Sequence, residues 1–137
     1  MIRSFLMGSI LLFAGALAHA DSASIETAKI AATEWLAIAD EYKYQETWSQ
    51  ASSLLQAEVS QSDWVGNIKN MREPLGKLEK RELSSSEFHE SLPGAPDGQY
   101  FIFTFDSSFE NNEYATEVIA VMKEDDSKWR VVGYYFA

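Results

Sequence analysis

The sequence predicts an α+β protein in which about three N-terminal helices pack on a four-stranded antiparallel sheet. Apolar residues recur at a spacing of three or four as far as Gly76, which is the period of a helix. Beyond Gly76 they recur at every second residue, which is the period of a strand. Clusters of Gly, Pro, Asn and Asp separate the later runs and indicate turns.

Three helices are expected in the first half of the chain. Ser22 or Ser24 caps the first helix, and residues 46–55 form a shorter second one. A capping box that starts at Ser60 opens the third, which residues 74–76 end. The apolar stripe of the first helix comprises Ile25, Ala28, Ala32, Trp35, Leu36, Ala39 and Tyr42.

Four strands are expected in the second half, over residues 78–88, 100–106, 114–122 and 128–136. The first is polar and alternating, which is typical of an edge strand. A dense turn signal at residues 93–98 separates the first strand from the second. The strands therefore form a meander in chain order.

Both faces of this sheet are rich in apolar side chains. Alternation places Phe101, Phe103 and Phe105 on one face, and Tyr100, Ile102 and Thr104 on the other. In the last strand it places Trp129 and Val131 opposite Val132, Tyr134 and Phe136. The few helices cover one face, so we expect a second copy of the chain to cover the other in a homodimer.

The first twenty residues have the layout of a secretory signal peptide. Arg3 precedes an apolar run over residues 5–17, and the small residues Ala18 and Ala20 place the cut between Ala20 and Asp21. The run is shorter than the ~20 residues of a spanning helix, so no stable membrane anchor is expected after cleavage. The mature chain, residues 21–137, is then one α+β domain in the periplasm or outside the cell.

Composition excludes several classes of function. The formal net charge of −10 repels nucleic acids and anionic lipids, so no nucleic-acid partner is expected. The chain has no cysteine, which excludes thiol nucleophiles and thiolate metal sites. His89 is the one histidine beyond the leader, and on a strand only Glu87 shares its side. We therefore expect neither a metal nor a cofactor.

Charged residues among apolar neighbours are the sharper candidates for a site. Glu117 lies in an apolar strand, Asp40 ends the first helix, Arg72 follows the stripe of the third helix, and Arg81 interrupts the first strand. A buried Glu117 or Asp40 with a raised pKa could transfer a proton, with Tyr44 or Tyr100 as a partner. The alternative, which we favour, is that Glu117 forms an ion pair with Arg72 or Arg81 and joins the helices to the sheet.

A family resemblance rests on residues spread along the chain. They are Trp35, Asp40, Tyr44, Trp48, Trp64, residues 72–76, Arg81, residues 93–100, Phe109, Glu117 and residues 129–135. In this order they resemble the family of exported bacterial proteins catalogued as domain of unknown function 4019. The resemblance implies a nuclear-transport-factor-2-like, or cystatin-like, fold in which helices pack against a strongly curved sheet and form a cone-shaped cavity. It implies no particular reaction.

Together these observations favour an exported, non-enzymatic accessory protein. It would bind a small apolar or aromatic ligand, or an envelope protein. A cofactor-free isomerase or lyase and a purely structural dimerisation module are the alternatives. The side chains expected to line a ligand pocket are Trp35, Tyr44, Trp48, Trp64, Arg72, Arg81, Phe103, Glu117 and Trp129; packing in the core is the competing explanation for the tryptophans.

Overall fold

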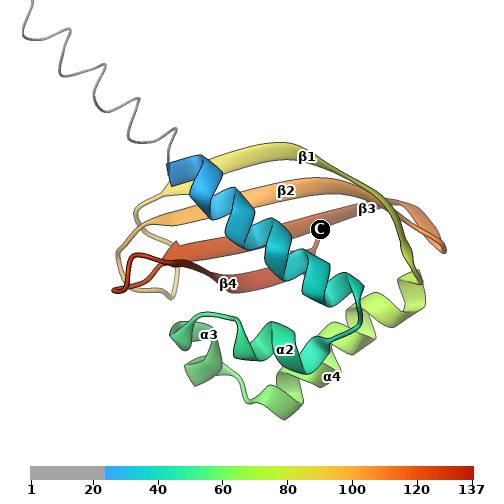
Figure 1. The fold of residues 1–137 in the computed structure, drawn as a ribbon, viewed down its shortest axis with the longest axis horizontal. Coiled ribbons are helices and arrows are strands. Elements are labelled where there is room, and N and C mark those ends of the chain that lie inside the picture. The colour runs from blue at the N-terminus through green and yellow to red at the C-terminus, as the bar shows by residue number, and fades with distance from the viewer. Residues whose placement is uncertain (1–23) are drawn as a thin grey trace, which may run out of the picture.

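The computed structural model describes residues 24–137 (Figure 1). The predicted signal peptide and its cleavage site lie outside the described residues. The chain is helical over residues 24–40. It continues through α2 (Tyr44–Ser49), α3 (Ser53–Glu58), α4 (Gln61–Arg72) and the 3-10 helix η1 (Glu73–Leu75). The strands follow as β1 (Leu78–His89), β2 (Tyr100–Phe109), β3 (Asn112–Lys123) and β4 (Trp129–Phe136).

The predicted helix over residues 46–55 is two short helices, so that prediction was wrong in extent. The chain breaks at Ser52, whose side chain accepts a hydrogen bond from the Leu55 backbone N–H and caps α3. The Ser52 N–H donates to the Val131 carbonyl oxygen of β4 at 2.8 Å, which ties the break to the sheet. The predicted cap at Ser60 is confirmed, because its side chain accepts from the Asp63 N–H.

The four strands form one antiparallel sheet in the order β1-β2-β3-β4. The predicted α+β meander is confirmed, and β1 lies at an edge as expected. The long helix, residues 24–40, crosses one face of the sheet. The helices α2, α3 and α4 lie together below the sheet in the view of Figure 1. α3 packs beside β4.

A β-bulge in β4 overturns one prediction about faces. Val121 pairs with Val131 while Ala120 pairs with Gly133, so Val132 is an extra residue in β4. The extra residue shifts the alternation, and Tyr134 therefore joins Val131 on the core face instead of opposing it. The same bulge turns Phe136 toward the core. Uninterrupted alternation had placed both aromatic rings on the outer face.

The core lies between the helices and the face of the sheet that carries Phe101, Phe103 and Phe105. The long helix contributes Ala28, Ala32, Trp35, Leu36 and Ala39 to this core, and α4 contributes Trp64 and Ile68. Small alanines along the helix let its backbone approach the aromatic strand closely. The outer face remains partly open: Ile102, Ala120 and Met122 are half-buried.

Candidate functional site

Four charged side chains from four separate elements meet between the helices and the sheet. Asp40 comes from the end of the long helix, Arg72 from the end of α4, Arg81 from β1 and Glu117 from β3. Glu117 is fully buried and Arg72 nearly so, whereas the side chains of Arg81 and Asp40 keep 13% and 21% of their surface exposed. We call these four residues the charge cluster.

Arg81 bridges the two carboxylates of the charge cluster. Its Nη1 and Nη2 donate to Oδ2 and Oδ1 of Asp40 at 2.7 and 2.9 Å, which is a bidentate pair. Its Nε and Nη2 donate to Oε1 and Oε2 of Glu117 at 2.7 and 3.1 Å, which is a second bidentate pair. One guanidinium therefore joins the long helix to β3.

Arg72 closes the cluster from the other side. Its Nη2 donates to Oδ1 of Asp40 at 2.7 Å, and its Nη1 lies 3.4 Å from Oε2 of Glu117. The same Nη1 donates to the hydroxyl of Tyr134 at 3.0 Å. The guanidinium carbon also lies 5.4 Å from the centre of the Phe109 ring, within cation–π range.

Two neutral side chains complete the surroundings of Glu117. The Ser107 hydroxyl donates to Oε1 at 2.6 Å, and the Tyr134 hydroxyl donates to Oε2 at 2.5 Å. With the arginine contacts, each carboxylate oxygen of Glu117 accepts at least two hydrogen bonds. Two carboxylates face two guanidiniums, so the charge cluster is neutral as a whole.

The directions in which the pKa values of this cluster and its neighbours are shifted oppose proton transfer. Burial alone raises the pKa of Asp40, but hydrogen bonds and charge from Arg81 and then Arg72 outweigh it and hold that pKa below its ordinary value. Burial, followed by the negative charge of Glu117, raises the pKa of Tyr134. Burial alone lowers the pKa of Arg81, and its hydrogen bonds with Asp40 and Glu117 reverse this and raise it. Asp40, Arg72 and Arg81 therefore remain ionised, and Tyr134 remains protonated, near neutral pH.

The structure thus contains the ion pair that was the alternative to the acid–base hypothesis. Glu117 pairs with both Arg72 and Arg81. None of the four charge-cluster side chains lines any of the five main surface hollows found among residues 24–137. The proposed tyrosine partners are also placed elsewhere. Tyr100 donates its hydroxyl to the Pro96 carbonyl oxygen, and the Tyr44 hydroxyl is buried, which raises its pKa.

The tryptophans expected to line a pocket lie mainly in the core. Trp35 donates its indole N–H to the Thr47 carbonyl oxygen at 2.8 Å, and Trp64 donates to the Thr47 hydroxyl at 3.0 Å. Trp48 is partly buried and donates to the Val59 carbonyl oxygen at 2.9 Å. These bonds satisfy the polar end of each ring and fasten α2 between the long helix and α4.

The remaining pocket candidates are packed in the same way. Phe103 is fully buried and stacks on Phe101 with ring centres 5.8 Å apart. The ring centre of Trp129 lies 5.3 Å from that of Phe101. One side of Trp35 and Trp129 lines a surface hollow of about 280 Å³. The nine candidates therefore lie partly in the core, partly in the charge cluster, and not around a shared hollow among residues 24–137.

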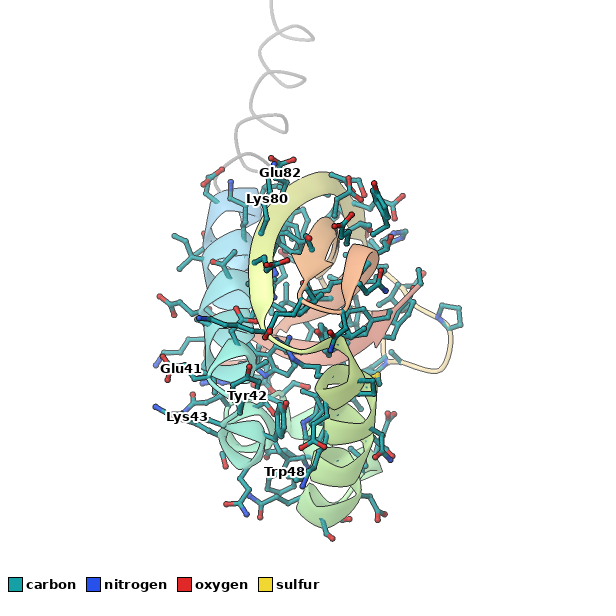
Figure 2. The ribbon with its side chains drawn as sticks, turned by 90° about the vertical axis from the view of Figure 1, so that its right-hand side faces the viewer. Glu41, Tyr42, Lys43, Trp48, Lys80 and Glu82 are labelled. Carbon is teal, nitrogen blue, oxygen red and sulfur yellow. The ribbon has the colours of Figure 1, made fainter. Side chains whose placement is uncertain are left out.

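A larger groove lies beside α2 and α4, and sequence reasoning missed it apart from Tyr44. Its volume is about 700 Å³, and its walls are residues 42–46, Ser49, Gln61, Val65, Lys69 and Glu73. Figure 2 shows Tyr42 and Lys43 in the turn that follows the long helix, next to Glu41. The rings of Tyr42 and Tyr44 meet edge to face, with centres 6.4 Å apart. We call this hollow the tyrosine groove.

Tyr42 at the rim of the tyrosine groove has a left-handed backbone conformation, with φ of 63°. The Lys43 N–H donates to the Ile38 carbonyl oxygen and the Tyr42 N–H to that of Ala39, which is the Schellman arrangement that ends a helix. Glycine usually occupies this position, since a side chain here meets the following carbonyl. The Tyr42 side chain is nevertheless 55% exposed, so its burial does not offset the strain.

Metal and membrane features of the described chain can be stated briefly. Among residues 24–137, no three side chains of the types His, Cys, Asp and Glu are grouped so that they could hold a metal ion. His89 Nε2 lies 3.7 Å from Glu87 Oε2. None of the helices in this part of the chain has both the length and the apolar character needed to cross a bilayer.

Sequence reasoning also missed Ser107 and Tyr134, which donate hydrogen bonds to Glu117 of the charge cluster. The alternation that placed Phe101, Phe103 and Phe105 on one face extends to Ser107, so a polar residue on an apolar face was the available signal. Tyr134 had no such signal, because the bulge before it reverses the alternation. Tyr42 had none either, since nothing in its neighbours requires a positive φ.

These features define an α+β domain with an open antiparallel sheet, whose helices and strands are joined by a buried, charge-balanced cluster. The chain belongs to the family described as a protein of unknown function, DUF4019, which matches residues 31–134. The resemblance noted in the sequence is thus confirmed at the level of the family. No curated protein and no solved structure matches the chain, so the nuclear-transport-factor-2-like fold stays a prediction.

Proposed function

We propose that this protein is a non-enzymatic, exported binding protein whose ligand occupies the tyrosine groove. The observation that carries the proposal is the left-handed Tyr42 at the rim. A non-glycine residue in this conformation costs roughly 1–2 kcal/mol. Strain that packing does not explain is a characteristic of residues held in place for binding or chemistry. The exposed ring of Tyr42 is thus best explained as a ligand contact.

The charge cluster supports the absence of catalysis in this proposal. An isomerase or lyase built on Glu117 or Asp40 needs a carboxyl group that can hold and release a proton near neutral pH. Every carboxylate oxygen of these two residues accepts a hydrogen bond from an arginine. Releasing one for chemistry would break a bidentate pair within a buried site.

Native mass spectrometry of the protein, purified gently from its own cells, tests the proposal. We expect the wild-type protein to retain a small molecule that the Tyr42→Gly variant loses. Ser127→Gly is the matched control, because Ser127 also has a left-handed backbone, with φ of 67°, in the turn between β3 and β4. A wild-type protein without any bound molecule, or one bound equally by Tyr42→Gly, would contradict the proposal.

We also propose that a second copy of the chain covers the outer face of the sheet. The middle of this face over β2 and β3 presents Ile102, Thr104, Val118, Ala120 and Met122, none of which is charged, in a chain of net charge −10; the exposed Asp106 lies farther along the same face of β2. A two-fold contact brings a surface against itself, so an uncharged patch avoids the repulsion that the rest of this acidic surface would cause.

Sedimentation at micromolar concentration tests the dimer. Tyr135 alternates with the core residues Tyr134 and Phe136, and 55% of its surface is exposed. We expect the wild-type protein to sediment as a dimer and Tyr135→Lys as a folded monomer. A wild-type monomer would remove this part of the proposal and leave the tyrosine groove unaffected.

A further inference from the structure

From the chemistry of the tyrosine groove we infer that its ligand is a neutral oligosaccharide. The inference rests on the proposed function, and it adds the class of ligand. Three properties of the groove carry it: the balance of its charges, the exposed face of its tyrosine, and the density of side chains that both donate and accept hydrogen bonds.

The walls of the groove carry two positive and two negative side chains, Lys43, Lys69, Glu46 and Glu73, so their charges balance. Lys43 Nζ lies 2.8 Å from Oε2 of Glu41, and Lys69 Nζ lies 3.7 Å from Oε1 of Glu73. The pKa of Lys43 is raised by its hydrogen bond to Glu41 and also by the nearby charge of Glu46. A phosphate or carboxylate ligand would have to displace these carboxylates, and a cationic ligand would meet the ammonium groups. A neutral ligand meets neither obstacle.

The aromatic side chains suit a ligand with one apolar face. The ring of Tyr42 is exposed at the rim, and the edge-to-face contact with Tyr44, at an angle of 82° between planes, limits its rotation. The π-face of a tyrosine carries partial negative charge. The C–H groups on one side of a pyranose carry partial positive charge, so a sugar ring packs flat on such a face.

The polar side chains suit the hydroxyl groups of a sugar. Gln45 and Gln61 are both exposed on the walls of the groove. Each amide offers two N–H donors and a carbonyl acceptor, which matches hydroxyl groups that both donate and accept. The volume of about 700 Å³ falls within the range of small-molecule sites.

The same geometry disfavours a peptide. Val65 is the one aliphatic side chain in the groove walls, whereas an amphipathic helix needs a row of apolar pockets. An added strand needs a free sheet edge, and the walls come from α2, α4 and the segments that flank them. A proline-rich segment would use the tyrosines and offer carbonyl acceptors, but its prolines have no N–H to donate to the carbonyl oxygens of the glutamines.

Titration of the ¹⁵N-labelled protein with hexasaccharides, followed by NMR, tests the inference. The probes are the β-1,4-linked hexamers of glucose and of N-acetylglucosamine, each raised to about 1 mM. We expect one of them to shift the backbone resonances of residues 42–46 and Lys69. Tyr42→Phe, which keeps the ring, should bind within threefold of the wild type, and Tyr42→Gly should bind at least tenfold more weakly. Ser127→Gly should bind like the wild type.

The outcomes separate this inference from the proposal beneath it. If neither hexamer shifts the resonances of the groove residues, the inference of an oligosaccharide ligand is overturned. Tighter binding of a proline-rich decapeptide than of the hexamers at the same residues also overturns it. The binding function itself still stands in either case if mass spectrometry finds a molecule whose retention depends on Tyr42. Binding of a hexamer that Tyr42→Gly leaves unchanged also overturns the inference, because the site would then lie elsewhere.

Discussion

The charge cluster and the tyrosine groove lie at the two ends of one short stretch of chain, from Asp40 to Tyr44, and they differ in what their polar groups contact. In the cluster, both carboxylates accept hydrogen bonds from arginines within the protein, while the buried Nε of Arg72 has no partner among the described residues. In the groove, Tyr42 is exposed and its backbone is strained. The comparison teaches that burial of charge in this protein contributes to the fold, whereas the exposed side chains of the groove are where a ligand would be recognised.

The largest expected effect comes from removing the central charge of the cluster. Glu117→Gln leaves Arg72 and Arg81 buried without one of their carboxylates, which should lower the free energy of unfolding by about 3–5 kcal/mol. Urea unfolding measures it. Glu113→Gln is the control, because Glu113 is exposed on the same strand, and it should change stability by less than about 0.5 kcal/mol.

Glu117→Gln also tests whether the charge cluster and the tyrosine groove have separate roles. Below its unfolding temperature, Glu117→Gln should retain the molecule that the wild-type protein binds, because Glu117 does not line the groove. Equal stability of Glu117→Gln and wild type would show that the cluster does not contribute to the fold as argued. Loss of the bound molecule with little loss of stability would instead make Glu117 part of the binding site.

A smaller effect is expected from Asp40 at acid pH. Its pKa in the folded protein is lower than the ordinary 3.8 of the unfolded chain, so the unfolded state takes up the proton first as the pH falls. The stabilisation by Asp40 is therefore present above about pH 4 and lost as the pH falls through its folded pKa. Asp40→Asn should be less stable at neutral pH and should show a shallower decline in acid.

Urea midpoints measured from neutral to acid pH check this prediction. Asp40 sits between Arg72 and Arg81, so the comparison isolates the acid response of one carboxylate of the cluster. If wild type and Asp40→Asn lose stability in parallel as the pH falls, the pKa of Asp40 is not shifted by the cluster.

Much of the fold could be predicted from the sequence because it depends on local pattern. Caps such as Ser60 and alternation such as Phe101 and Phe103 require only neighbouring residues. The residues Glu117, Arg72 and Arg81 could also be singled out, since charge within apolar runs needs a partner. Their joint geometry could not, because it depends on how four elements pack.

The missed features share a physical cause, which is a departure from local regularity. The bulge at Val132 turns Tyr134 into the core, and it arises from pairing with β3 instead of from the residues of β4 alone. The break at Ser52 likewise depends on a bond to Val131 across the fold. Tyr42 adopts a backbone conformation that its residue type disfavours, so propensity argues against it.

The smallest expected change in stability, at Tyr42, is also the sharpest test of the comparison. Tyr42→Gly and Tyr42→Ala both remove the ring, but only glycine relieves the left-handed backbone. Tyr42→Gly should therefore be more stable than Tyr42→Ala by about 1 kcal/mol, and at least as stable as the wild type. Urea unfolding of the three proteins measures the difference. A tyrosine kept for packing would make the glycine variant clearly less stable than the wild type, whereas a tyrosine kept for a ligand leaves stability intact and removes binding in both variants.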